Sequence, residues 1–141
     1  MVRPFKTQDL EQVMKLWLNG NLQAHSFVKE EYWKKNYEMV ESVLPDSEVY
    51  VCMEEEKVAG FIGMDGEYIE GIFVDKDYQR KGIGHQLLEA VRGRRRLFLN
   101  VYEKNLGAVA FYKSEGFQVE EKQLDEETGE TEYRMVWKMP E

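Results

Sequence analysis

A strand-to-helix turn in the middle of the chain constrains the fold more than any other feature. Residues 74–91 read VDKDYQRKGIGHQLLEAV: an apolar run ends at Val74, and apolar residues recur at helical spacing after Gly82 and Gly84. A helix N-terminus exposes unpaired backbone N–H groups and the positive end of the helix dipole. Because glycine has no Cβ, an anion can approach that backbone closely. The turn therefore predicts either a phosphate site or an ordinary tight turn whose glycines serve packing.

The hydrophobic pattern divides the rest of the chain into strands and helices. Strands are predicted at residues 1–6, 48–53, 58–64, 68–74, 96–102, 117–124 and 131–139, and helices at residues 7–19, 30–44, 83–92 and 105–115. The sequence Asn-Gly-Asn at 19–21 is predicted to end the first helix, and Asn105 to cap the fourth. The order β-α-α-β-β-β-α-β-α-β-β predicts a single α+β domain over residues 1–141, built around a mixed sheet.

Composition excludes several classes of protein. The chain has 141 residues and a net charge of −8, which argues against a protein that binds nucleic acid or an anionic membrane. It contains no apolar run of about 18 residues, which a membrane span would need, and no secretory leader is recognisable at its start. Cys52 is the only cysteine, so no internal disulfide can form. A cytoplasmic protein is therefore predicted. The acids and histidines show no metal-ligand spacing, so no metal is expected.

Two stretches resemble the signatures of the GCN5-related N-acetyltransferases (GNAT). Residues 79–84, QRKGIG, resemble the family pattern Q/R-x-x-G-x-G/A. Residues 100–117, NVYEKNLGAVAFYKSEGF, resemble the second signature, in which an asparagine precedes a helix that carries A-x-x-F-Y-x-x-x-G-F. The likeness spans essentially the whole chain. It implies an acetyl-CoA-dependent N-acetyltransferase with a mostly antiparallel sheet of about seven strands and four helices. The loop AHSFV and the segment DEETGE are similar to a small bacterial branch that includes enzymes reported to modify protein lysines.

The resemblance implies where acetyl-CoA binds. In the family, the strand before the glycine turn (residues 79–84) splays away from the next strand, and the pantetheine arm pairs with its backbone. The amides at the start of the helix hold the pyrophosphate, an amide near Ile72 faces the thioester oxygen, and Asn105 contacts the arm. The implied cofactor-binding residues are Ile72, Phe73, Val74, Gln79, Arg80, Lys81, Gly82, Ile83, Gly84, His85, Asn105 and Tyr112.

The resemblance also implies catalytic roles. Tyr112 matches the general acid, which protonates the departing thiolate; the alternative role is that of a packed aromatic residue. The family's best-known base position falls on Tyr68, which is not an acid. Glu70 lies two residues further on and either acts as the base, directly or through water, or only orients a cationic substrate. The acceptor amine is expected to lie near His25, Phe27, Trp33 and Tyr68.

Several functions stay open on the sequence alone. The acceptor is either a protein lysine or N-terminus, or a small amine such as a polyamine, an amino acid or an antibiotic. A CoA-binding sensor without catalysis is the alternative from another class, although such a protein would not need the phenol of Tyr112. A nucleotide-phosphate binder would explain the glycine turn but not the signature at 105–117. Nucleic acid and membranes are not expected as partners, and the protein is predicted to be a monomer or a homodimer.

Overall fold

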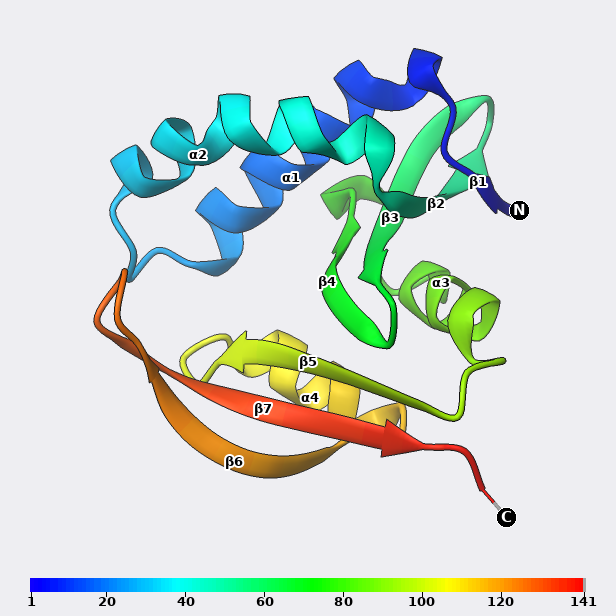
Figure 1. Cartoon of the computed structure of the whole chain (residues 1–141). Coiled ribbons are helices and arrows are strands. Elements are labelled where there is room, and N and C mark those ends of the chain that lie inside the picture. Colours follow the sequence, from blue (N-terminus) through cyan, green and yellow to red (C-terminus); the bar gives the residue numbers. More distant parts are fainter. Residues whose placement is uncertain (141) are drawn as a thin grey trace.

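A computed structural model describes residues 1–140 of the chain (Figure 1). The strands are β1 (Val2–Pro4), β2 (Glu48–Glu54), β3 (Lys57–Asp65), β4 (Tyr68–Val74), β5 (Arg96–Tyr102), β6 (Gln118–Asp125) and β7 (Glu130–Lys138). The α-helices are α1 (Leu10–Ala24), α2 (Glu30–Val43), α3 (Ile83–Val91) and α4 (Leu106–Ser114). Short 3₁₀ turns cover Thr7–Asp9, Leu44–Asp46 and Lys76–Tyr78. The predicted order of elements is confirmed, and the bounds of β4 and β5 agree with the prediction.

One sheet contains all of these strands, in the order β1-β2-β3-β4-β5-β7-β6. Every neighbouring pair is antiparallel except β4 and β5, which run parallel and pair at a single position, Tyr68 with Phe98. Beyond that pair the two strands diverge, so the N-terminal and C-terminal halves of the sheet are joined by very little ladder (Figure 1). The predicted mostly antiparallel α+β fold is confirmed.

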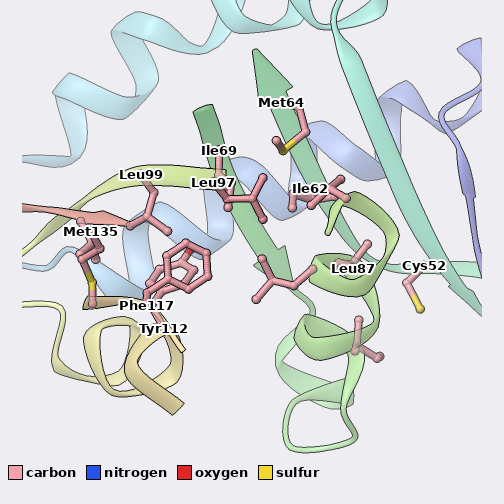
Figure 2. Packing of buried hydrophobic residues seen from close by; sticks show 14 of the residues in the cluster. Cys52, Ile62, Met64, Ile69, Leu87, Leu97, Leu99, Tyr112, Phe117 and Met135 are labelled. Atoms are coloured by element: carbon pink, nitrogen blue, oxygen red, sulfur yellow. The ribbon is translucent and has the colours of Figure 1, made fainter. Parts of the chain in front are cut away.

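The helices cover both faces of the sheet. Helices α1 and α2 lie on one face, where Val13, Met14 and Leu44 pack against β2 and β3. Helices α3 and α4 lie on the other face and share a larger core with the strands (Figure 2). The apolar stripe predicted for α3 is buried throughout, with Ile83, Leu87, Leu88 and Val91 at 2% exposure or less. Within residues 1–140, no helix is both long enough and apolar enough to cross a membrane.

The first helix is longer than predicted. Asn-Gly-Asn at 19–21 does not end α1, which continues to Ala24. Gly20 serves packing, because a Cβ there would lie 2.7 Å from the Phe73 ring of β4. Asn21 is buried and donates from Nδ2 to the Trp17 carbonyl at 2.9 Å, a bond that fits inside the helix. The glycine and the asparagine therefore let the helix lie close to the sheet.

Candidate active site

The divergence of β4 from β5 leaves a backbone edge free. From Ile69 to Val74, β4 pairs with β3 on one side and has no strand partner on the other among the residues that the structure describes. An extended ligand can pair with such an edge as an added strand. Phe73 stacks on Phe61 at 5.0 Å and packs, partly buried, against the core beneath α1, so its ring has a packing partner. The predicted pantetheine contacts Ile72, Phe73 and Val74 all lie on this free stretch.

The glycine turn leads directly into α3. Gly82 is the N-cap with φ 79°, a left-handed conformation that favours glycine, and a Cβ there would have no atom within 4 Å. Gln86 N donates to the Gly82 carbonyl at 3.0 Å and closes the first helical turn. The amides of Ile83, Gly84 and His85 therefore have no acceptor within the helix. The space above Gly82 and these amides suit an anionic group such as a pyrophosphate.

Cations surround the glycine turn. Arg80 is exposed and has φ 65°, a strained conformation for a residue other than glycine. Lys81 Nζ lies 5.3 Å from the centre of the Tyr78 ring. Lys57, from the start of β3, lies 5.7 Å from the same ring and forms a 3.6 Å ion pair with Asp75. Arg80 and Lys81 thus add positive charge at the turn, whereas the charge of Lys57 is balanced by Asp75.

Gly84 has a reason for its missing side chain that is independent of any phosphate contact through its amide. A Cβ on Gly84 would lie 2.8 Å from Cζ of Phe111 in α4. Its missing side chain therefore points at the neighbouring helix and lets α3 and α4 approach. Gly82 therefore provides open space at the backbone, whereas the absence of a side chain at Gly84 serves packing and leaves its amide available to a ligand.

We expect Gly84→Ala to lower the free energy of unfolding by about 1–3 kcal/mol, the usual cost of overpacking a core. Phe111→Leu should recover part of this loss in the double variant, because the shorter side chain vacates the position that the new methyl group needs. Denaturant unfolding and acetyl-CoA titration of both variants provide the measurement. If the double variant is stable yet still binds acetyl-CoA poorly, Gly84 faces the phosphate after all.

Two predicted cofactor side chains have other partners. Gln79 donates from Nε2 to the Val74 carbonyl at 3.3 Å and closes the loop between β4 and α3. The His85 ring is exposed and lies 2.8 Å, measured from Nδ1, from a carboxylate oxygen of Glu115 at the end of α4. For both residues a role in binding acetyl-CoA would therefore rest on the backbone rather than on the side chain.

Tyr112 projects from α4 into the core next to the divergence of the strands. It belongs to the same buried cluster as Leu99 and Met135 (Figure 2), and its ring makes an edge contact with Phe117 at 5.6 Å. The residue is 7% exposed. Burial raises the pKa of the Tyr112 phenol, and the nearby Tyr68 phenol raises it further. The group therefore stays protonated at neutral pH and is available as a proton donor.

Tyr68 and Glu70 lie on β4 beside the same divergence. Burial is the main cause that raises the pKa of Tyr68, and the charge of Glu70 adds to it. The register of β3 and β4 shifts between Gly63 and Met64, and Glu70 is the residue left without a partner. Burial, followed by the charge of Asp65, raises the pKa of Glu70 although its side chain is exposed. A carboxylate with a raised pKa is a better proton acceptor near neutral pH.

The α1–α2 loop (residues 25–29) brings together the other predicted residues. His25 stacks on Trp33 at 5.3 Å and makes edge contacts with Phe27 at 5.6 Å and with Tyr102 at 5.0 Å. Its Nε2 lies 3.1 Å from Nδ2 of Asn105. Asn105 also caps α4 as predicted, since its Oδ1 accepts from the Ala108 amide at 3.3 Å. Three predicted acceptor contacts and one predicted cofactor contact therefore form one cluster.

Comparison with known proteins identifies the family. Residues 10–139 match the family model of the acetyltransferase (GNAT) domain. The chain belongs to the GNAT family of acetyltransferases. It is 31% identical over 140 residues to the peptidyl-lysine N-acetyltransferase YiaC of Escherichia coli, a match that covers 97% of this chain and 96% of the relative.

Further relatives agree with this assignment. The peptidyl-lysine N-acetyltransferase YjaB of Escherichia coli is 31% identical over 120 residues, covering 84% of this chain and 82% of YjaB. The solution structure of apo-form YjaB superimposes with a TM-score of 0.85 at 27% identity, over 97% of this chain and 96% of that one. The protein is thus an acetyl-CoA-dependent N-acetyltransferase of the GNAT family, as the sequence signatures imply.

The GNAT chain has features that fit acetyl-CoA. The free edge of β4 suits the pantetheine arm, and the open backbone at Gly82 suits the pyrophosphate. Within residues 1–140, no group of three or more histidine, cysteine, aspartate or glutamate side chains could hold a metal ion.

Sequence reasoning missed several residues of this region. The pairing of β3 with β4 brings Lys57 near the glycine turn, and no sequence motif indicates this residue. Tyr102 and Asn21 contact His25 from β5 and α1. Asn100 on β5 has a buried Oδ1 without a hydrogen-bond partner in the part of the chain that the structure describes. The alternation of β5 could have indicated Asn100 and Tyr102, since both lie on the face opposite the buried Leu99 and Val101.

Proposed function

We propose that this GNAT enzyme transfers the acetyl group directly from acetyl-CoA to the side-chain amine of a protein lysine. The observation that carries the proposal is the placement of Tyr112, Tyr68 and Glu70 around the point where β4 and β5 diverge. Burial raises the pKa of both phenols, and the neighbouring Tyr68 and Glu70 raise those of Tyr112 and Tyr68 further. A buried proton donor and an exposed proton acceptor thus lie near the free edge of β4.

The proposed reaction uses each group once. The lone pair of the neutral amine attacks the thioester carbonyl carbon, and an amide of β4 near Ile72 stabilises the oxyanion. The carbon–sulfur bond then breaks, and the thiolate takes the phenol proton of Tyr112. Lysine arrives as an ammonium ion, so before the attack Glu70 takes one proton from it, directly or through water. The second proton, which the nitrogen loses when the amide forms, returns Tyr112 to the phenol. The products are an amide and the free thiol of CoA, and no covalent enzyme intermediate is formed.

The choice of a lysine acceptor is supported by charge and by similarity. Glu70 borders an open depression of about 340 Å³ that is also lined by Asp46, Glu48 and Asp65. Glu48 is paired with Arg94, so the carboxylates of Glu70, Asp46 and Asp65 are the ones that favour a cationic acceptor. YiaC, which matches over nearly the full length of both chains, bears the name of a peptidyl-lysine N-acetyltransferase. A cytoplasmic location and a monomeric or homodimeric state stay predictions.

The proposal predicts that lysine peptides with basic flanking residues are acetylated faster than neutral or zwitterionic amines. Added salt should slow the reaction, because it screens the exposed carboxylates around Glu70. The measurement is CoA release across a panel of lysine peptides, peptides with a free N-terminal alanine, spermine and amino acids, with mass spectrometry to locate the acetyl group. An anionic amine as the best acceptor would contradict the proposal, as would binding of acetyl-CoA without transfer to any amine.

A further inference from the structure

A chain of hydrogen bonds connects α1 to α4 across the divergence of the strands. The Trp17 carbonyl accepts from Nδ2 of Asn21 at 2.9 Å, and Oδ1 of Asn21 lies 3.1 Å from Nδ1 of His25. On the other side of the ring, Nε2 of His25 lies 3.1 Å from Nδ2 of Asn105. Oδ1 of Asn105 accepts from the Ala108 amide at 3.3 Å. Every polar atom of these three side chains therefore has a partner.

The partners define the protonation of the ring. An amide nitrogen can only donate, so Nδ2 of Asn105 requires His25 Nε2 to be an acceptor without a proton. An amide oxygen can only accept, so Oδ1 of Asn21 requires a proton on Nδ1. The orientations of the two asparagines are in turn fixed, because Asn21 must donate to a carbonyl and Asn105 must accept from an amide. His25 is therefore the neutral tautomer that carries its proton on Nδ1.

The surroundings of the ring maintain that state. His25 lies between the Trp33 ring, on which it stacks, and the edges of Phe27 and Tyr102. Burial among these rings lowers the pKa of His25 to about 4. No carboxylate is within salt-bridge distance of the ring in the described part of the chain. The imidazole thus stays neutral at physiological pH and keeps its lone pair on Nε2.

This chain of bonds lies where the two halves of the sheet have little direct connection. The two halves of the sheet share a single ladder pair, Tyr68 with Phe98. The contact between His25 and Asn105 joins residues 80 apart in the sequence and ties the α1–α2 loop to the first turn of α4. Asn105 uses its oxygen for the helix cap and one amide hydrogen for His25, so one amide hydrogen remains for a ligand.

We propose that His25 is a positioning residue for acetyl-CoA: its Nε2 holds the side-chain amide of Asn105 so that the remaining N–H faces the pantetheine arm. The proposal deepens the proposed function, since it rests on the placement of that arm along β4. Holding the amide in advance lowers the ordering cost of binding. The same contact fixes the α1–α2 loop, which is predicted to border the acceptor site, relative to α4.

The first test compares three substitutions at His25. His25→Phe keeps an aromatic ring for Trp33 and removes the acceptor; we expect acetyl-CoA to bind about 3- to 10-fold more weakly, the effect of one ordinary hydrogen bond. His25→Gln places an amide oxygen near the position of Nε2 and should bind within about twofold of the wild type. His25→Ala removes ring and acceptor and should bind no better than the Phe variant. Calorimetric titration measures these affinities.

A second pair of variants tests the link through Asn21. Asn21→Ala leaves Nδ1 without its acceptor, so the tautomer is no longer imposed and acetyl-CoA binding should weaken. Asn36→Ala is the matched control, because Asn36 in α2 makes the same bond to a carbonyl four residues earlier, Tyr32 at 2.7 Å, and contacts no histidine. Equal affinity losses for the two variants would overturn the proposal.

The wild-type protein provides a readout that needs no variant. The chain has two histidines, so long-range ¹H–¹⁵N NMR spectra of the rings show His25 beside His85 as an internal reference. We expect His25 to carry its proton on Nδ1 from pH 5 to pH 8 and its Nε2 signal to shift on addition of acetyl-CoA. A proton on Nε2 would overturn the proposal. Because these readouts are tautomer and affinity, failure of lysine acetylation would leave them unaffected and would count against the proposed function alone.

Discussion

Replacement of Tyr112 by phenylalanine is expected to lower kcat by about 10²–10⁴-fold, the range typical of a general acid. The variant loses one oxygen and keeps the ring that contacts Phe117 at 5.6 Å. Folding and acetyl-CoA affinity should therefore change little, and the loss should appear in kcat rather than in KM. The measurement is steady-state CoA release, with the Kd for acetyl-CoA taken from calorimetry.

The pH profile supplies a second test of Tyr112. Burial and Tyr68 raise the pKa of this phenol above its usual value of 10.0, so it loses its proton at a higher pH than an exposed tyrosine does. The wild-type rate should therefore show no alkaline decline at the pH where an exposed tyrosine ionises. Tyr133→Phe is the control, since that phenol lies on β7 and donates to Glu103 at 2.9 Å. Full turnover of Tyr112→Phe would return Tyr112 to the role of a packed aromatic residue.

The fold was largely predictable because its signals are local. Apolar and aromatic runs mark β4 and β5, helical spacing marks α3, and Asn105 and Gly116 mark the two ends of α4. Each of these signals depends on residues within one or two turns of the chain. The glycine turn is equally local, which is why its position between strand and helix agrees with the structure.

The predicted end of the first helix at residues 19–21 is wrong, because the reason for a glycine depends on its tertiary neighbours. Gly20 resembles a helix terminator in the sequence but lies against Phe73, and Gly84 resembles a phosphate contact but lies against Phe111. A missing Cβ has the same appearance in a sequence whether it admits an anion, a turn or another helix. Gly82 differs from Gly20 and Gly84 by its positive φ and by the open space around it.

The network around His25 could not be predicted for a related reason. His25 and Asn105 are 80 residues apart, and their contact depends on how the two halves of the sheet diverge. The position of Glu70 has the same origin, because the shift in register between β3 and β4 interrupts the simple alternation that a strand pattern assumes. Sequence motifs can indicate such residues, but their partners follow from the packed fold.

Replacement of Glu70 by glutamine is expected to lower kcat by about 10²-fold or more at neutral pH, because the variant cannot accept the amine proton. Glu70 requires its charged form for this role, so the wild-type rate should fall as the pH drops through its pKa. Burial and Asp65 raise that pKa above the usual 4.5, which places the acidic decline at a higher pH than for an exposed glutamate. The decline should be absent in Glu70→Gln.

Substitution of neighbouring acids distinguishes two roles for Glu70, that of a general base and that of a group that only attracts the substrate. Asp65→Asn removes a charge that raises the pKa of Glu70, so the acidic decline should move to lower pH while kcat is retained. Asp46→Asn is the matched control: it removes a charge from the same depression, yet Asp46 is not among the causes of the shift at Glu70. Rate–pH profiles of the three variants with a lysine peptide decide the question. If Glu70→Gln raises KM for the peptide but keeps kcat, Glu70 orients the cationic acceptor and the amine proton leaves through water.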